Sequence, residues 1–315
     1  MRILKAKGLS KKVWKYIVHP EQFVTNIRFR KLHSANGRQM DDAEYLKRAF
    51  KLKLGYALNL ENPKTYNEKL QWLKLYDRRP KYTEMVDKYE AKRYVAERIG
   101  EQYIIPTLGV WDKFADIDFD ALPEQFVLKC THDCGGLVIC RDKKAFDREV
   151  AERKINACLS RNYYWQWREW PYKNVKPRII AEQYMEDTKT AELRDYKFFA
   201  FDSVVRAVFI ASDRQKEDEE TKFDFFDADF NHLPVINGHP NADVLPQKPE
   251  RFEEMLMLAS KLSAGIPHVR VDFYEVDGRV YFGELTLYHW SGLTPFKPKE
   301  WDEIFGSWIQ LPEKE

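Results

Sequence analysis

The sequence lacks a strong charge of either sign, because 52 lysines and arginines are balanced by 50 aspartates and glutamates among its 315 residues. A net charge of +2 gives no electrostatic reason to expect a nucleic acid as partner. Long apolar runs are also missing. The first residues alternate lysine with small apolar groups and never form the roughly 7–15-residue apolar core of a signal peptide. We therefore expect a cytoplasmic protein without a membrane-spanning helix.

Cysteine is scarce, with four residues and no paired C-x-x-C spacing. Together with the missing secretory signal, this pattern argues against disulfides and against a zinc knuckle. We expect reduced and mostly structural thiols at Cys130, Cys134, Cys140 and Cys158.

The charge is uneven near the start of the chain. Met1 to Lys31 holds nine lysines and arginines against the single acid Glu21, with four aromatic residues between them. Two interpretations stay open. In the first, the stretch makes a peripheral contact with an anionic membrane surface, at the inner face of the membrane, or with an acidic polymer. In the second, it is a solvated basic helix.

The pattern along the chain predicts an α+β protein with a helical N-terminal extension. Residues 1–85 are helical and basic in character, and a larger domain follows over residues 86–312. Within it, two short β-rich runs, Phe126–Cys130 and Leu137–Cys140, flank a glycine-containing loop, which we expect to be mobile. No internal repeat or low-complexity tract is present.

The second half of this domain reads as hairpins and one helix. Residues 196–210 predict a hairpin that turns at Asp202 and Ser203. An amphipathic helix is expected from Pro249 to Leu262, ending at Gly265.

Candidate chemistry lies in the last predicted hairpin, which turns at Asp277-Gly278. Strand alternation puts Arg270 and Asp272 on one face of its first strand. Glu284 and Thr286 share a face of the returning strand. Two carboxylates on paired strands can hold Mg²⁺, which prefers oxygen ligands.

The register of this hairpin decides whether the two acids meet. A two-residue turn alone would pair Asp272 with Gly283 and send Glu284 to the opposite side. An odd-length turn or a bulge is therefore required. A three-residue turn with Gly278 in the left-handed conformation would bring Asp272 opposite Glu284.

Several motifs, in this order, resemble the ATP-grasp superfamily, and within it the TupA-like group associated with teichuronopeptide and capsular polysaccharide synthesis. The likeness runs from about Asn62 to the C-terminus and is carried by Leu128-Lys-Cys-Thr-His-Asp-Cys-Gly-Gly136, Arg194-Asp-Tyr-Lys197 and Arg270-Val-Asp-Phe-Tyr274. It implies an ATP-grasp fold, in which two α+β subdomains grip ATP. We place the lid subdomain at about 110–181 and the metal-binding subdomain at about 182–312.

The resemblance also implies roles for residues outside the hairpin. Three lysines, Lys88, Lys129 and Lys197, would contact the nucleotide phosphates, and backbone N–H groups around Gly135 and Gly136 would close over them. Residues 182–185 match the hinge that lies along adenine, so cofactor contacts are expected from Glu182, Gln183 and Met185.

At the metal, the implied ligands are Asp272, Glu284 and Thr286. Thr286 departs from the asparagine common in related ligases, so coordination through water, or a contact from Tyr288 or His289, stays open. Arg270, Lys129 and Lys197 are the implied catalytic residues. Arg270 would steady the acyl phosphate and the oxyanion, since a guanidinium stays protonated and cannot act as a base.

The activity that the resemblance implies is that of an ATP- and Mg²⁺-dependent carboxylate–amine ligase, and the family association implies a role in cell-surface polysaccharide biosynthesis, in capsule or teichuronopeptide synthesis or modification. Its partners would be a small-molecule or saccharide carboxylate and an amine or amino acid. The aromatic stretch from Tyr163 to Tyr172 would suit sugar stacking or core packing.

Two other functions stay open. The acidic pair Asp227-Ala-Asp229 is the D-x-D pattern of nucleotide-sugar glycosyltransferases, although such a pattern is common by chance. A non-catalytic ATP-grasp module is the other alternative. His132 beside Asp133 suggests a general base, but we expect it to bind a phosphate or the backbone instead.

Overall fold

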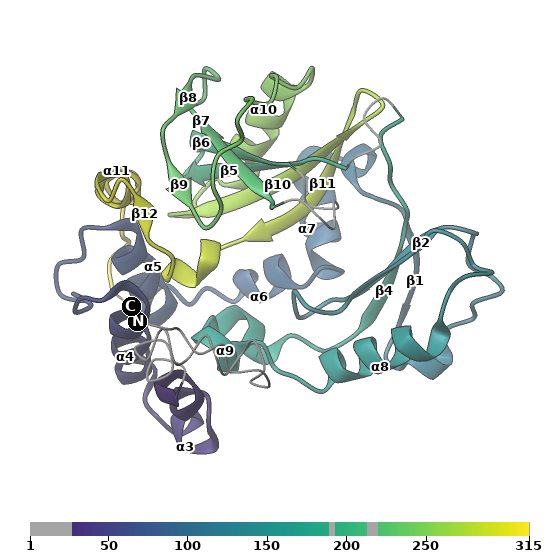
Figure 1. Cartoon of the computed structure of the whole chain (residues 1–315), viewed down its shortest axis with the longest axis horizontal. Helices are drawn as coiled ribbons and strands as arrows, with labels where there is room; N and C mark the ends of the chain where they lie inside the picture. The colour runs from purple at the N-terminus through teal and green to yellow at the C-terminus, as the bar shows by residue number, and fades with distance from the viewer. Residues whose placement is uncertain (1–26, 189–192, 213–219, 315) are drawn as a thin grey trace, which may run out of the picture. The chain divides into compact units, whose positions relative to one another are not determined.

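The computed structural model describes residues 27–188, 193–212 and 220–314 (Figure 1). The chain divides into two compact units, residues 1–58 and 59–315. The first contains helices α3 (Ala35–Arg38) and α4 (Asp42–Leu54). The Asp41 carboxylate caps α4 by accepting hydrogen bonds from two backbone N–H groups of its first turn, and Gly55 ends it in the left-handed conformation.

The predicted basic stretch lies almost entirely outside the described residues, since only its last five residues are included. Its contact with a membrane or an acidic polymer therefore stays a prediction. Among the residues that are described, no helix is both long and apolar enough to cross a bilayer.

The second unit begins with three helices, α5 (Tyr66–Tyr76), α6 (Lys81–Val86) and α7 (Glu90–Ile99). Thr65 and Glu68 form a reciprocal capping box at the start of α5. The Asp302 carboxylate of α11 (Glu300–Trp308) accepts hydrogen bonds from the Asn67 backbone and side-chain amides, both at 2.9 Å. Helix α5 thus belongs with the second unit, whereas the sequence pattern placed it in the N-terminal region. Its helical periodicity could not reveal a partner more than 200 residues away.

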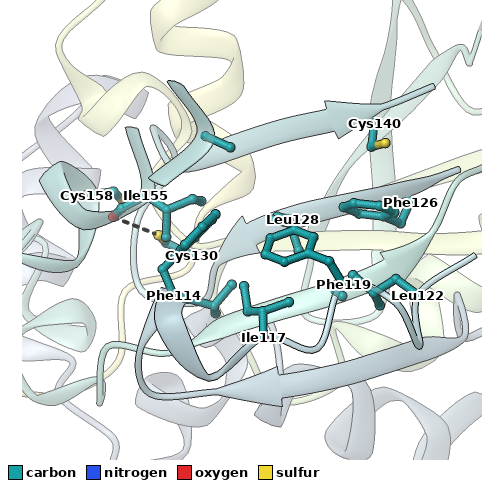
Figure 2. Close-up of a cluster of buried hydrophobic side chains, with 13 residues drawn as sticks. Phe114, Ile117, Phe119, Leu122, Phe126, Leu128, Cys130, Cys140, Ile155 and Cys158 are labelled. Carbon is teal, nitrogen blue, oxygen red and sulfur yellow. Dashed lines mark hydrogen bonds between the residues drawn. The ribbon is translucent and has the colours of Figure 1, made fainter. Parts of the chain in front are cut away.

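A small antiparallel sheet follows, with strand order β1-β4-β2-β3. Its strands are β1 (Thr107–Trp111), β2 (Phe126–Cys130), β3 (Leu137–Cys140) and β4 (Ile179–Gln183). Apolar side chains such as Phe126, Leu128 and Cys130 pack on one face of this sheet with α8 (Arg148–Leu159), as Figure 2 shows. The two predicted runs on either side of the glycine loop are confirmed as paired strands.

The larger sheet is also antiparallel and has the order β11-β10-β5-β6-β7-β8. Its strands are β5 (Asp195–Phe201), β6 (Val204–Ser212), β7 (Lys222–Phe226), β8 (His232–Leu233), β10 (Val269–Val276) and β11 (Arg279–Thr286). The predicted turn at Asp202 and Ser203 is confirmed, and both residues have positive φ. Phe198 of β5 packs against Phe252 of α10 (Phe252–Leu262), which covers one face of the sheet (Figure 1). The opposite face carries the charged side chains.

The remaining elements are short. They are η1 (Glu101–Tyr103), η2 (Phe114–Asp116), α9 (Tyr164–Trp167), η3 (Trp170–Asn174), β9 (Ile236–Asn237), η4 (His289–Gly292) and β12 (Phe296–Lys297). Among them, β9 and β12 pair as a two-stranded antiparallel sheet. Antiparallel sheets with separate helices confirm the predicted α+β class.

Candidate active site

Asp272 and Glu284 lie directly opposite each other on β10 and β11, as predicted. The turn, however, has only two residues, Asp277 and Gly278, with φ of 50° and 76°. The shift occurs at Gly283, an extra residue on β11 between the Phe273–Phe282 and Asp272–Glu284 pairs. The predicted three-residue turn is therefore wrong, whereas the alternative prediction of a bulge is confirmed. A Cβ at Gly283 would lie only 3.1 Å from the Asp272 carbonyl oxygen, so glycine suits the bulge.

The Asp272 carboxylate is buried between two cations. Its two oxygens accept hydrogen bonds from Arg270 Nε and Nη2, both at 2.7 Å. Its Oδ2 atom also accepts one from Lys197 Nζ of the neighbouring strand β5. Burial lowers the pKa of Lys197, and the nearby Asp272 charge opposes that shift. The three side chains form one charged cluster on the face of the larger sheet opposite α10.

Glu284 and Thr286 complete this cluster from β11. The Glu284 side chain is 41% exposed, and its Oε1 atom lies 3.1 Å from Arg270 Nη2. Removal from water raises the pKa of Glu284, but the surrounding lysines and Arg270 outweigh this effect and lower it to about 2. The Thr286 hydroxyl accepts a hydrogen bond from Arg270 Nη2 at 3.0 Å. Glu284 is therefore an ionised carboxylate that faces open space, and Thr286 contacts its arginine partner.

A cavity of about 200 Å³ opens beside Glu284 and is lined by the three predicted lysines, Lys88, Lys129 and Lys197. A fourth lysine, Lys92, also lines it and was missed by the sequence reasoning. It lies one helical turn after Lys88, a spacing that could have indicated a shared face. The cavity thus gathers cations from α7, β2 and β5, together with Lys88, which lies two residues before α7.

Glu182 has a different contact from the one expected at an adenine hinge. Its carboxylate forms ion pairs with Lys92 Nζ at 2.6 Å and with Lys129 Nζ at 2.5 Å. Burial raises the pKa of Glu182, but the charges of the two lysines outweigh this effect and lower the pKa to about 2. Glu182 therefore holds two lysines at the cavity wall.

A second cavity of about 280 Å³ adjoins the first and shares Ile105, Lys129, Leu137, Glu182, Asp195 and Tyr274 with its lining. Both predicted hinge residues Gln183 and Met185 line it. The Gln183 backbone N–H donates to the Pro106 carbonyl at 3.0 Å, so this group is not available to a base. The sequence did not identify Ile105, Leu137 or Tyr274, because apolar residues in strands have no distinctive spacing when they line a slot.

The glycine loop between β2 and β3 is tied to its surroundings. Lys88 Nζ donates to the Asp133 carbonyl at 2.9 Å, and the Gly135 N–H donates to the Asp133 carboxylate at 2.8 Å. Gly136 lines the lysine-bearing cavity, whereas Gly135 does not. His132 is buried with its Nε2 atom 3.2 Å from the Cys158 carbonyl oxygen, and burial lowers its pKa. The contact with the Cys158 carbonyl agrees with the expectation that His132 binds the backbone.

Other candidates lie outside this cluster. The Asp227 carboxylate accepts hydrogen bonds from the backbone N–H groups of Asp229 and Asn231, and neither aspartate lines the two cavities. The Tyr288 ring lies under Lys74 Nζ at 5.7 Å, and both His289 nitrogens have partners. The Asp227 carboxylate thus stabilises its own turn. Tyr288 and His289, which could have supplied an extra contact at the metal, are not directed at Asp272.

The aromatic stretch packs largely on itself. The Tyr163 and Tyr172 rings meet edge to face at 4.8 Å. The Arg168 guanidinium lies 4.7 Å from the Trp165 ring, and its side chain is buried. Sugar stacking by this segment stays a prediction.

Comparison with known proteins yields one family and several solved structures. A family model described as TupA-like ATP-grasp matches residues 68–310. No curated protein matches the chain.

Three solved structures illustrate what the chain is similar to. The D-alanine–D-alanine ligase of Bacillus anthracis in complex with ATP is 16% identical, with 64% of this chain and 53% of that chain covered and a TM-score of 0.37. An L-amino acid ligase of Bacillus licheniformis is 14% identical, with 78% and 55% covered and a TM-score of 0.44. The ATP-grasp ligase PsnB, in complex with a precursor variant, Mg and ADP, is 11% identical, with 70% and 57% covered and a TM-score of 0.40. The matched regions thus span little more than half of those proteins.

Proposed function

The chain belongs to the TupA-like ATP-grasp family, and from this premise we propose that it is an ATP-dependent ligase that activates a carboxylate for capture by an amine. One observation carries the proposal. Asp272 and Glu284 face each other across paired strands, beside a cavity lined by Lys88, Lys129 and Lys197. A triphosphate needs both features, cations around its oxygens and carboxylates for its metal.

The two adjoining cavities suit the two ends of a nucleotide. The cavity with Val127, Ile139 and Met185 in its lining offers apolar surface for adenine. The cavity beside Glu284 offers the lysines for the phosphates. Lys129 lines both, so it would lie between the base and the phosphate chain.

The residues present fit a magnesium ion. Asp272 and Glu284 offer hard oxygen ligands from adjacent strands, and Glu284 is ionised over the whole physiological range because its pKa is about 2. These two acids would hold the ion, and Thr286 would contribute through its contact with Arg270. When bound, magnesium supplies charge neutralisation for phosphoryl transfer.

The remaining chemistry would fall to the chain's own cations. A carboxylate oxygen of the substrate attacks the γ-phosphorus, the bond to the β-phosphate oxygen breaks, and ADP leaves. Lys129 and Lys197 would stabilise the charge that moves during this step. The amine nitrogen then attacks the acyl carbon, inorganic phosphate leaves, and the nitrogen loses a proton. Arg270 would stabilise the oxyanion formed in the second step, because a guanidinium stays charged.

We place this activity in cell-surface polysaccharide biosynthesis, with a saccharide or small-molecule carboxylate as acceptor. This placement is supported by the family association alone, so it needs a test that is separate from the test of ligase activity. Competition between a panel of uronic acids and a panel of amino acids as the activated carboxylate would decide it.

The first test is nucleotide binding. ATP with Mg²⁺ should raise the unfolding midpoint of the purified protein, whereas UDP-sugars should leave it unchanged. Stabilisation by UDP-sugar alone would contradict the ligase and favour a glycosyltransferase. The second test is release of ADP with carboxylate and amine pairs. ATP binding without any release would favour the non-catalytic module.

A further inference from the structure

A buried chain of polar contacts runs from Arg270 away from the carboxylates. Arg270 Nη1 lies 2.7 Å from His289 Nδ1, and His289 Nε2 lies 3.0 Å from the Asn237 Oδ1 atom of β9. All three side chains are buried. We propose that His289 is a positioning residue that fixes the guanidinium plane of Arg270 toward Asp272 and Glu284, an inference that rests on the function proposed for Arg270.

The direction of every hydrogen bond in this chain is determined. Arginine can only donate, so Nδ1 of His289 must carry the lone pair that accepts from Arg270. The ring proton therefore lies on Nε2 and is donated to Asn237 Oδ1. The Asn237 amide nitrogen in turn faces the Thr294 and Pro295 carbonyl oxygens, both at 3.3 Å, which sets the orientation of the amide. A neutral His289 with one tautomer follows from these partners.

The backbone that carries His289 is held in an unusual conformation. Trp290, Ser291 and Gly292 have φ of 48°, 55° and 60°, and two of the three are not glycine. Such residues are strained and persist only where the surroundings hold them. Lys74 Nζ and Gln71 Nε2 both donate to the Ser291 carbonyl, at 2.8 and 3.0 Å. The turn after β11 is thus clamped from α5, and the imidazole is held in place at Arg270.

This arrangement holds Arg270 at two ends. Its Nε and Nη2 atoms face Asp272, and Nη2 also contacts Glu284, while Nη1 faces His289. Asp272 and Glu284 would hold a magnesium ion when it is bound, and their contacts with Arg270 would then be weaker. His289 is not a metal-site acid and would retain its contact. The imidazole would therefore keep the guanidinium in place during the reaction.

Matched substitutions separate this role from general packing. His289→Asn keeps an acceptor at the same bond separation from Cβ as Nδ1, whereas His289→Leu removes it at similar volume. Asn237→Leu removes the contact between His289 and Asn237, together with the Asn237 amide contacts to the Thr294 and Pro295 carbonyl oxygens. It leaves the His289 contact to Arg270 in place and serves if His289→Leu does not fold. Thermal unfolding of each variant identifies the ones that remain folded.

The first readout does not depend on catalysis. In protein labelled with ¹⁵N at arginine guanidinium groups, the Arg270 resonances, assigned with Arg270→Lys, should show hindered rotation in wild type and His289→Asn. They should show fast rotation in His289→Leu. Unchanged Arg270 resonances in folded His289→Leu and Asn237→Leu would overturn the proposal.

The second readout is ADP release. We expect His289→Leu to lower kcat about 10- to 100-fold with little change in the KM for ATP, and His289→Asn to restore most of the loss. Equal kcat in wild type and His289→Leu would also overturn it. If wild type releases no ADP with any substrate pair, the proposed ligase fails, while the resonances still decide whether His289 positions Arg270.

Discussion

The Asp272 and Glu284 side chains face each other because one glycine, Gly283, is unpaired between them and the hairpin turn. A regular ladder from the two-residue turn would place these acids on opposite faces of the sheet. The bulge therefore creates the candidate metal site, and removing the negative charge of either acid should slow the proposed chemistry.

Asp272→Asn and Glu284→Gln should each lower the rate of ADP release about 100- to 1000-fold, because one electrostatic contact in the transition state is lost. The fold should persist, as checked by circular dichroism and thermal unfolding. Asp229→Asn and Glu253→Gln are matched controls, since both residues are exposed and lie outside the two cavities. A loss of activity in Asp229→Asn would instead support a functional role for the D-x-D pattern.

Gly136→Ala should destabilise the smaller sheet. A Cβ at this position would lie 2.4 Å from Cys130 Sγ and 2.6 Å from Cys158 Sγ, both of which are buried in the core shown in Figure 2. Overpacking of this kind typically costs about 1–3 kcal/mol. Urea unfolding measures the change. Gly135→Ala is the comparison, because its nearest obstacle is the flexible end of the Arg161 side chain.

The ion pairs of Glu182 should make stability depend on pH below about 4.5. Its pKa in the folded protein is about 2, below the ordinary 4.5, so its contribution is present above 4.5 and lost as the pH falls toward 2. A shift of this size corresponds to about 3 kcal/mol. Glu182→Gln should therefore lower the free energy of unfolding at pH 7 by roughly that amount, and the difference from wild type should shrink on acidification. A constant difference across this range would contradict the assignment.

A fragment of residues 59–315 should fold and bind ATP with Mg²⁺, whereas a fragment of residues 86–315 should not fold. The second fragment lacks α5, and with it the Asn67 contacts to Asp302 and the Gln71 contacts to Ser291 and Gly292. Limited proteolysis and heteronuclear NMR spectra of both fragments would measure this. A folded 86–315 fragment would instead support the boundary expected from the sequence.

The sequence by itself determined the local features. Strand alternation placed Arg270 with Asp272 and Glu284 with Thr286, and the position of the turn at Asp277-Gly278 followed from its residue types. The order of the motifs was sufficient to predict the family, since a model of that family matches residues 68–310. These features depend on spacing along the chain, which is fully visible in the sequence.

Only the tertiary structure decided which distant residues meet. Three features depend on packing between separate elements. They are the position of the register shift at Gly283, the ion pairs of Glu182 with two lysines, and the contact of His289 with Arg270. Likewise, Asn67 joins Asp302 across 235 positions, which assigned α5 to the larger unit. Periodicity reports which face of an element is apolar or charged, but the partner of that face depends on how the whole chain packs.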